Sequence, residues 1–226
     1  MSANTLLNQG GPIMYLLLGM SVLAVAVMAF KAFHFFRYRV FRTDFVGKAM
    51  QCVREENSDA ALALLSKERS PVARVMETTV RVAVDPTMAH ADSEAEIARV
   101  GSSQIREMES WLRVLSSIAH LAPFCGLLGT VLGMIEAFMN LQAAGTRVDP
   151  AVLYGGIWEA LLTTAFGMAV AIPAMAAYFY FEGEVDKARA GMKDASIGVL
   201  VHYRKSRLAS ALNTETLEEA SRRKGA

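Results

Sequence analysis

The chain contains three long stretches without Asp, Glu, Lys or Arg. The first extends to residue 30, the second covers residues 114–135 and the third covers residues 160–181. A helix of about 20 apolar residues crosses the roughly 30 Å of hydrocarbon in a bilayer. The pattern therefore predicts an all-α membrane protein with transmembrane helices at residues 13–36, 114–141 and 152–181.

The flanking charges predict how these spans are oriented. Lys and Arg gather at residues 37–54 and 187–207, whereas the connection between the second and third spans carries only Arg147. Because basic segments favour the cytoplasmic side of a membrane, we expect the N-terminus outside and the C-terminus in the cytoplasm. The domain plan is an external N-terminus at 1–12, cytoplasmic helical segments at 37–113 and 182–226, and an external loop at 142–151.

The first span has a nearly uniform apolar core, so we expect it to face lipid. Lys31 lies close to its inner end. A lysine at such a position can extend its long side chain to the membrane surface. The prediction is that Lys31, together with His34, snorkels to the interface.

Residues 43–113 place apolar side chains at helical spacing, interrupted by turn signals. Asn57, Ser70–Pro71 and Asp85–Pro86 are predicted helix boundaries, because polar caps precede helices and Pro is tolerated in a first turn. A short cytoplasmic helical subdomain is expected.

Ser93 followed by Glu96 has the spacing of a capping box at a helix start. One apolar face continues beyond it into the second span. We therefore expect a single unbroken helix from this point to residue 141, kinked within the membrane at Pro123.

The composition narrows the class of function. Hydrophobic residues make up 53% of the chain and the net charge is +1, so there is no basic excess for binding nucleic acid. The four histidines are scattered and none stands at metal-ligand spacing from a Cys, His or carboxylate. We expect no metal site.

Small residues in the second span predict close helix packing. Gly126, Gly129 and Gly133 are not a phosphate-binding loop, because no Lys-Ser/Thr follows them and their neighbours are apolar. Gly129 and Gly133 form a small-xxx-small pair that lets two helix backbones approach. The third span offers two alternative matching surfaces, one with Ala165, Ala169 and Pro173 and the other with Gly167, Ala171 and Ala174.

Polar groups inside the spans are the candidate functional residues. A carboxylate such as Glu159 is costly in a membrane unless it faces protein, water or an ion path; the alternative is that it lies shallow and snorkels. Thr130 and Thr164 lie about 16 to 18 Å from the outer surface when depth is counted at 1.5 Å per residue. The two threonines are therefore predicted to lie at matching heights near the middle of the membrane.

Glu159 also begins a stripe along one face of the third span, which continues through Thr163, Gly167, Val170 and Ala174. The stripe is a candidate pore lining, since a proton path needs exchangeable groups or water at mid-membrane. For Thr163 taken alone, a hydrogen bond to a carbonyl of its own helix is the competing interpretation.

The hairpin spans together resemble the MotA/TolQ/ExbB proton-channel family, with its ExbB and TolQ branches the most similar. The resemblance rests on residues 122–134, on the run 155–167 that contains Glu159 and Thr164, and on Ala171–Ala174. MotA-like members have four spans, whereas the pattern here predicts three. The ExbB branch is preferred and the TolQ branch is the alternative.

The resemblance implies a subunit of the bacterial inner membrane that is not an enzyme. It implies a homopentamer around two copies of a single-span partner, ExbD-like or TolR-like, whose membrane aspartate carries the proton. Protons are the driving ion and no cofactor is implied. In the ExbB branch rotation does work on TonB for transport across the outer membrane, and in the TolQ branch the output reaches TolA. The implied pore-lining residues are Thr130, Glu159 and Thr164.

Two other classes of protein fit less well. An intramembrane protease would need a nucleophile and base, and the nearest residues, Ser116, Ser117 and His120, lack a Gly-x-Ser-x-Gly elbow. A non-conducting membrane scaffold leaves the intramembrane Glu159 without a purpose. The stripe below Thr164 lacks an ionisable side chain, so a partner helix bearing an acid is expected to complete the path.

Overall fold

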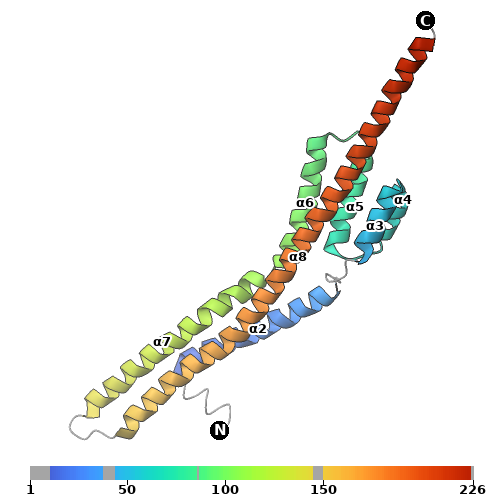
Figure 1. Ribbon diagram of the computed structural model, residues 1–226. Helices are drawn as coiled ribbons and strands as arrows, with labels where there is room; N and C mark the ends of the chain where they lie inside the picture. The colour runs from blue at the N-terminus through green and yellow to red at the C-terminus, as the bar shows by residue number, and fades with distance from the viewer. Residues whose placement is uncertain (1–10, 38–43, 86, 145–149, 225–226) are drawn as a thin grey trace. The chain divides into compact units, whose positions relative to one another are not determined.

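The computed structural model describes residues 11–37, 44–85, 87–144 and 150–224, and all regular structure in them is helical (Figure 1). The helices are α2 (Gly11–Arg37), α3 (Asp44–Arg54), α4 (Ser58–Leu65), α5 (Pro71–Val84), α6 (His90–Glu109), α7 (Leu112–Ala144) and α8 (Pro150–Lys224). Three contain stretches long and apolar enough to cross a membrane, at Gly11–Phe35, Leu112–Ala143 and Tyr154–Ala209. The predicted all-α class with three candidate spans is confirmed.

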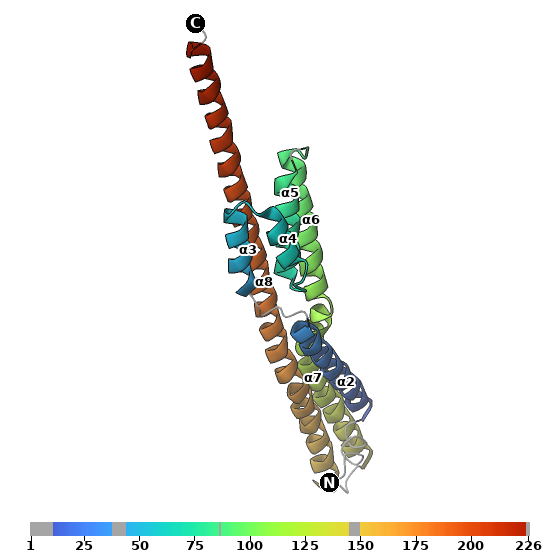
Figure 2. The same ribbon diagram turned by 90° about the vertical axis from the view of Figure 1, so that its right-hand side faces the viewer.

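The chain divides into two compact units. The membrane unit contains α2 up to Phe33, residues 109–144 and α8 up to Gly183. The second unit contains α3, α4, α5, most of α6 and the remainder of α8. In the membrane unit α7 and α8 lie side by side, as both views show (Figures 1 and 2).

Helix α2 packs one face inside the protein. Met14, Leu17, Ala24 and Val27 are buried, and their spacings of three and seven residues put them on one side of the helix. Other large side chains of α2 are exposed, including that of Phe33. Only part of this helix is therefore available to lipid.

Lys31 does not snorkel. Its side chain is fully buried, and its Nζ atom donates to Ser110 Oγ at 3.4 Å, just before the start of α7. The prediction was wrong because a polar partner inside the protein lies within reach of the ammonium group. Burying a charge is costly unless polar groups surround it, so this end of the membrane unit must supply them.

The long helix expected to run into the second span is interrupted. Helix α6 ends at Glu109 and α7 begins at Leu112, with Trp111 in the left-handed region at φ 65°. The Trp111 carbonyl accepts the Leu115 N–H at 3.1 Å and so opens the new helix. The apolar pattern passes through this break, because Met108, Leu112 and Leu115 are all buried. The apolar periodicity of the sequence therefore gives no sign of the break between α6 and α7.

The capping box at Ser93 is also absent. Helix α6 begins three residues earlier, and Ser93 Oγ donates to the Ala89 carbonyl at 3.1 Å from within the first turn. Glu96 instead accepts two hydrogen bonds from Arg99, both at 2.7 Å. A carboxylate held in this fork is not free to bind the start of the helix.

The other predicted boundaries are confirmed. Asn57 Oδ1 accepts the Ala60 N–H at 3.0 Å at the start of α4, and Pro71 occupies the first turn of α5. Asp85 ends α5 in an extended conformation and accepts the Thr87 N–H at 2.8 Å. The hydrogen bonds from Thr87 hold the pKa of the Asp85 carboxyl below its usual value.

Replacing the cap of α4 should loosen that helix alone. Asn57→Ala removes the acceptor for the Ala60 N–H and should lower the stability of the helix by about 1 kcal/mol. The equilibrium constant for local opening of the helix then rises roughly fivefold. We expect amide exchange across Ser58–Leu65 to accelerate by about that factor. Asn57→Asp keeps an acceptor and serves as the control. Equal exchange in the alanine variant and the native protein would contradict the capping role.

Polar contacts attach α8 to the helices of the second unit. Thr79 Oγ1 of α5 donates to Ser196 Oγ at 3.2 Å, and both residues are buried. The hydroxyls of Ser58 and Tyr203 lie 2.7 Å apart. Around these contacts α5 buries an apolar face of Val72, Val75, Met76 and Val80.

Candidate functional site

The candidate site lies along the antiparallel contact between α7 and α8 in the membrane unit. Gly126 lies against residues 163–167, Gly133 against Ala160, and Ala137 against Gly156. Advancing along α7 thus corresponds to moving backwards along α8. This register brings Thr130 and Thr164 to nearly the same height, as the sequence predicted.

Three glycines bring the two backbones into close contact. A Cβ on Gly129 would lie 2.5 Å from Thr163 Oγ1, and one on Gly126 would lie 2.9 Å from the Thr163 carbonyl oxygen. A Cβ on Gly167 would lie 2.6 Å from the carbonyl oxygen of Ala122. Distances this short cannot be tolerated, so these positions require glycine at the observed helix separation.

The remaining predicted packing residues differ among themselves. Gly133 is less tight, since a Cβ there would lie 3.3 Å from the Ala160 Cβ. Ala171 is buried together with Gly167, so the second of the two alternative surfaces lies inside the protein. Pro173 is exposed in the single chain, and its packing role stays a prediction.

Two adjacent threonines of α8 converge on one carbonyl of α7. Thr164 Oγ1 donates to the Gly126 carbonyl at 3.1 Å, and Thr163 Oγ1 lies 3.4 Å from the same oxygen. Thr163 is 2% exposed and makes a shorter bond of 2.7 Å to Ala160 of its own helix. The interhelical bonds form because Gly126 has no side chain to hold α8 away.

Thr130 occupies the facing helix at the same level. Its Oγ1 donates to the Leu127 carbonyl at 2.7 Å, one turn back on α7. All three threonines therefore use their hydroxyl protons on backbone carbonyls. Each oxygen keeps lone pairs that can accept a hydrogen bond from water or from an acid.

Glu159 lies toward the end of the site where α8 begins and is partly buried. Its Oε1 atom would lie 3.6 Å from a Cβ built on Gly11, the first residue of α2. The charge of Glu136, on α7, acts on Glu159. Glu136 is not among the functional residues predicted from the sequence, although it directly follows the charge-free run of residues 114–135. The signal was its position inside the apolar helix Leu112–Ala143.

The lower part of the predicted stripe packs inside the single chain. Gly167, Val170 and Ala174 are all buried, as is Thr163. Whether these residues line a pore in an assembly stays a prediction. Thr164 and Glu159 are less enclosed and have side chains that can exchange protons.

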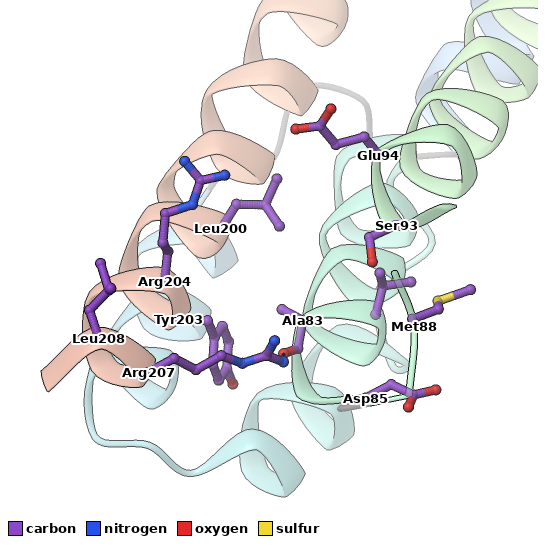
Figure 3. A pocket seen from close by; sticks show the side chains of 11 residues that line it. Ala83, Asp85, Met88, Ser93, Glu94, Leu200, Tyr203, Arg204, Arg207 and Leu208 are labelled. Carbon is purple, nitrogen blue, oxygen red and sulfur yellow. Dashed lines mark hydrogen bonds between the residues drawn. The ribbon is translucent and has the colours of Figure 1, made fainter. Parts of the chain in front are cut away.

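The second unit contains a separate cavity of about 310 Å³ at the end of α5, walled by α6 and α8. Figure 3 shows Arg207 reaching Ala83, whose carbonyl accepts a hydrogen bond from the guanidinium group. The arginine thus satisfies a carbonyl at the C-terminus of α5. The sequence-predicted site residues all belong to the membrane unit and lie outside this cavity.

Three candidate spans, two of them packed through glycines with a polar seam between them, define a multi-pass membrane protein. Residues 67–194 match the MotA/TolQ/ExbB proton channel family. The match covers more than half of the chain, and the chain belongs to this family. It is therefore a multi-pass membrane protein of a channel family and not an enzyme.

Individual relatives carry ExbB names. The chain is 29% identical over 181 residues to an ExbB homolog from Methanothermobacter thermautotrophicus, described as a biopolymer transport protein, which covers 79% of the chain and 62% of the relative. It is 39% identical over 105 residues to the biopolymer transport protein ExbB of Pseudomonas putida, covering 46% of the chain and 32% of the relative. For the Salmonella typhimurium protein of the same name the identity is 36% over 108 residues, covering 48% of the chain and 42% of the relative.

The chain thus spans less than two thirds of each of these relatives. The similarity supports the ExbB branch that the sequence analysis preferred.

Proposed function

We propose that the chain is an ExbB-like subunit of an inner-membrane motor driven by protons. Together with a single-span ExbD-like partner, it converts proton-motive force into work on a TonB-like protein for transport across the outer membrane. The observation that carries this proposal is the convergence of Thr163 and Thr164 on the Gly126 carbonyl, at the height of Thr130. The relatives named ExbB favour this branch over a TolQ-like subunit acting on TolA.

The proton path uses the polar side chains of the seam. Glu159 collects protons near the outer end, and the threonine oxygens accept hydrogen bonds from water or from the partner's acid. Thr164 is the principal contact because its hydroxyl bonds across to the Gly126 carbonyl and its side chain, unlike that of the buried Thr163, is partly exposed to a donor. Thr130 on α7 and Thr163 on α8 contribute further hydroxyl oxygens to the same path.

The working assembly is a homopentamer that surrounds two copies of the partner. Support comes from the large apolar side chains that the single chain exposes on α7 and α8, among them Leu127, Val131, Leu161 and Met168. Faces of this kind need lipid or further subunits to cover them. The N-terminus lies in the periplasm and the C-terminus in the cytoplasm, following the distribution of Lys and Arg.

Deletion of the gene in its host tests the proposed output. We expect loss of proton-driven uptake of a radiolabelled ligand of an outer-membrane receptor, restored by the native gene. Resistance to detergents should remain, since envelope maintenance is the output of the TolQ branch. Intact uptake with new detergent sensitivity would move the chain to that branch, and no change in either would overturn both assignments.

A further inference from the structure

The end of the membrane unit opposite Glu159 carries a second polar cluster that the proton path described above does not use. Tyr178 Oη donates to Glu182 Oε1 at 2.6 Å, one turn away on α8. The Ser116 side chain of α7 lies within hydrogen-bonding reach of Tyr178, and the charge of Glu109 acts on Tyr178. Both members of the Tyr178–Glu182 pair are partly buried.

The pair continues the stripe that holds the candidate site. From Thr163 the residues Gly167, Val170, Ala174 and Tyr178 follow at steps of three or four, which keeps them on one face of α8. The side chains between Thr164 and Tyr178 include no ionisable group. The stripe therefore has proton-exchanging groups at both ends and an apolar middle.

The two ends are separated by the thickness of a membrane. Glu159 and Glu182 are 23 residues apart on one continuous helix. At about 1.5 Å per residue this is roughly 35 Å, slightly more than the hydrocarbon of a bilayer. A path with an acid at each boundary is complete only if something carries the proton across the middle.

We infer that Tyr178 and Glu182 form the exit relay of the proton path, in which the tyrosine hydroxyl passes a proton to the Glu182 carboxylate. This inference rests on the proposed function, because the partner's membrane acid delivers the proton. Tyr178 lies 14 residues from Thr164, roughly 21 Å along the helix, so water carries the proton that this acid releases to the lone pair of Tyr178 Oη, while the original Oη–H proton moves to Glu182. Glu182 then releases the proton to water, so the tyrosine is regenerated and the partner's acid is left as a carboxylate.

The observed hydrogen bond already has the direction that this step requires. Tyr178 donates toward Glu182, so the receiving carboxylate is aligned before a proton arrives. The Ser116 side chain lies beside this hydroxyl on the facing helix α7.

The test uses the complex of the chain with its partner in proteoliposomes, with proton entry followed by an internal pH-sensitive dye. Tyr178→Phe removes only the hydroxyl, and Glu182→Gln removes only the charge. We expect each to lower proton flux by about tenfold or more, in keeping with the loss of a proton-transfer group. Glu182→Asp should restore part of the flux because it keeps a carboxylate.

Tyr180→Phe is the matched control, since Tyr180 is two residues further on and 57% exposed. It should conduct within about twofold of the native complex, and all variants should assemble equally by size-exclusion chromatography. If Tyr178→Phe and Glu182→Gln conduct protons as well as the native complex does, the relay is wrong and the proposed function is unaffected. A native complex that conducts no protons would overturn the proposed function and the relay together.

Discussion

Thr164→Val is expected to lower proton-driven transport by about tenfold or more while the protein still assembles. Valine has nearly the volume of threonine but cannot accept a proton or a hydrogen bond from the partner's acid. The variant loses the bond to the Gly126 carbonyl, a stability cost of about 1 kcal/mol. That cost is small beside the glycine packing around it, so a loss of transport would reflect chemistry and not misfolding.

Three further variants test the same path. Thr164→Ser retains the hydroxyl and should keep most of the transport. Glu159→Ala should abolish transport, and Glu159→Asp should recover part of it because a carboxylate remains. Measured as proton-driven uptake in cells with equal amounts of membrane-inserted protein, full activity of Thr164→Val or Glu159→Ala would remove that residue from the path.

Gly129→Leu is expected to break the oligomer. A Cβ alone at this position would lie 2.5 Å from Thr163 Oγ1 and 2.7 Å from its Cβ, so the added side chain must push the helices apart. Overpacking of this kind costs about 1–3 kcal/mol or more, and here it acts on the contact that sets the whole seam. Native mass spectrometry should show loss of the assembled species.

Gly19→Leu is the control for this substitution, because a Cβ on Gly19 in α2 would have no neighbour within 4 Å. Its oligomer should match that of the native protein. An unchanged oligomer in Gly129→Leu would contradict the packing role of the seam. Gly133→Leu should give a milder loss than Gly129→Leu, since a Cβ at Gly133 would lie 3.3 Å from its nearest neighbour.

Most of the membrane unit could be predicted from the sequence, because its determinants are local. Charge-free runs define the spans, and glycines repeated at helical spacing define the face where α7 approaches α8. The height of Thr130 against Thr164 followed from counting residues on both sides of one short connection. None of these inferences needs knowledge of the side chains on another helix.

The incorrect predictions have both local and long-range causes. The pattern around Trp111 is amphipathic on both sides of the break, so only the backbone conformation reveals that α6 and α7 are separate. Lys31 was expected at the interface because its distance from Ser110 cannot be counted along the chain. Glu136 and Tyr178 could not be selected from the sequence either, because each interacts with residues on the facing helix.

Proton flux into proteoliposomes is the most direct test of a proton channel that a partner helix completes. The chain reconstituted with its single-span partner should admit protons down an imposed pH gradient, and Glu159→Ala should reduce that entry. The chain alone should conduct protons at most about one tenth as fast as the complex, because the stripe has no ionisable group between Thr164 and Tyr178. Equal flux with and without the partner, or flux of the complex no greater than that of protein-free vesicles, would contradict a partner-completed proton channel.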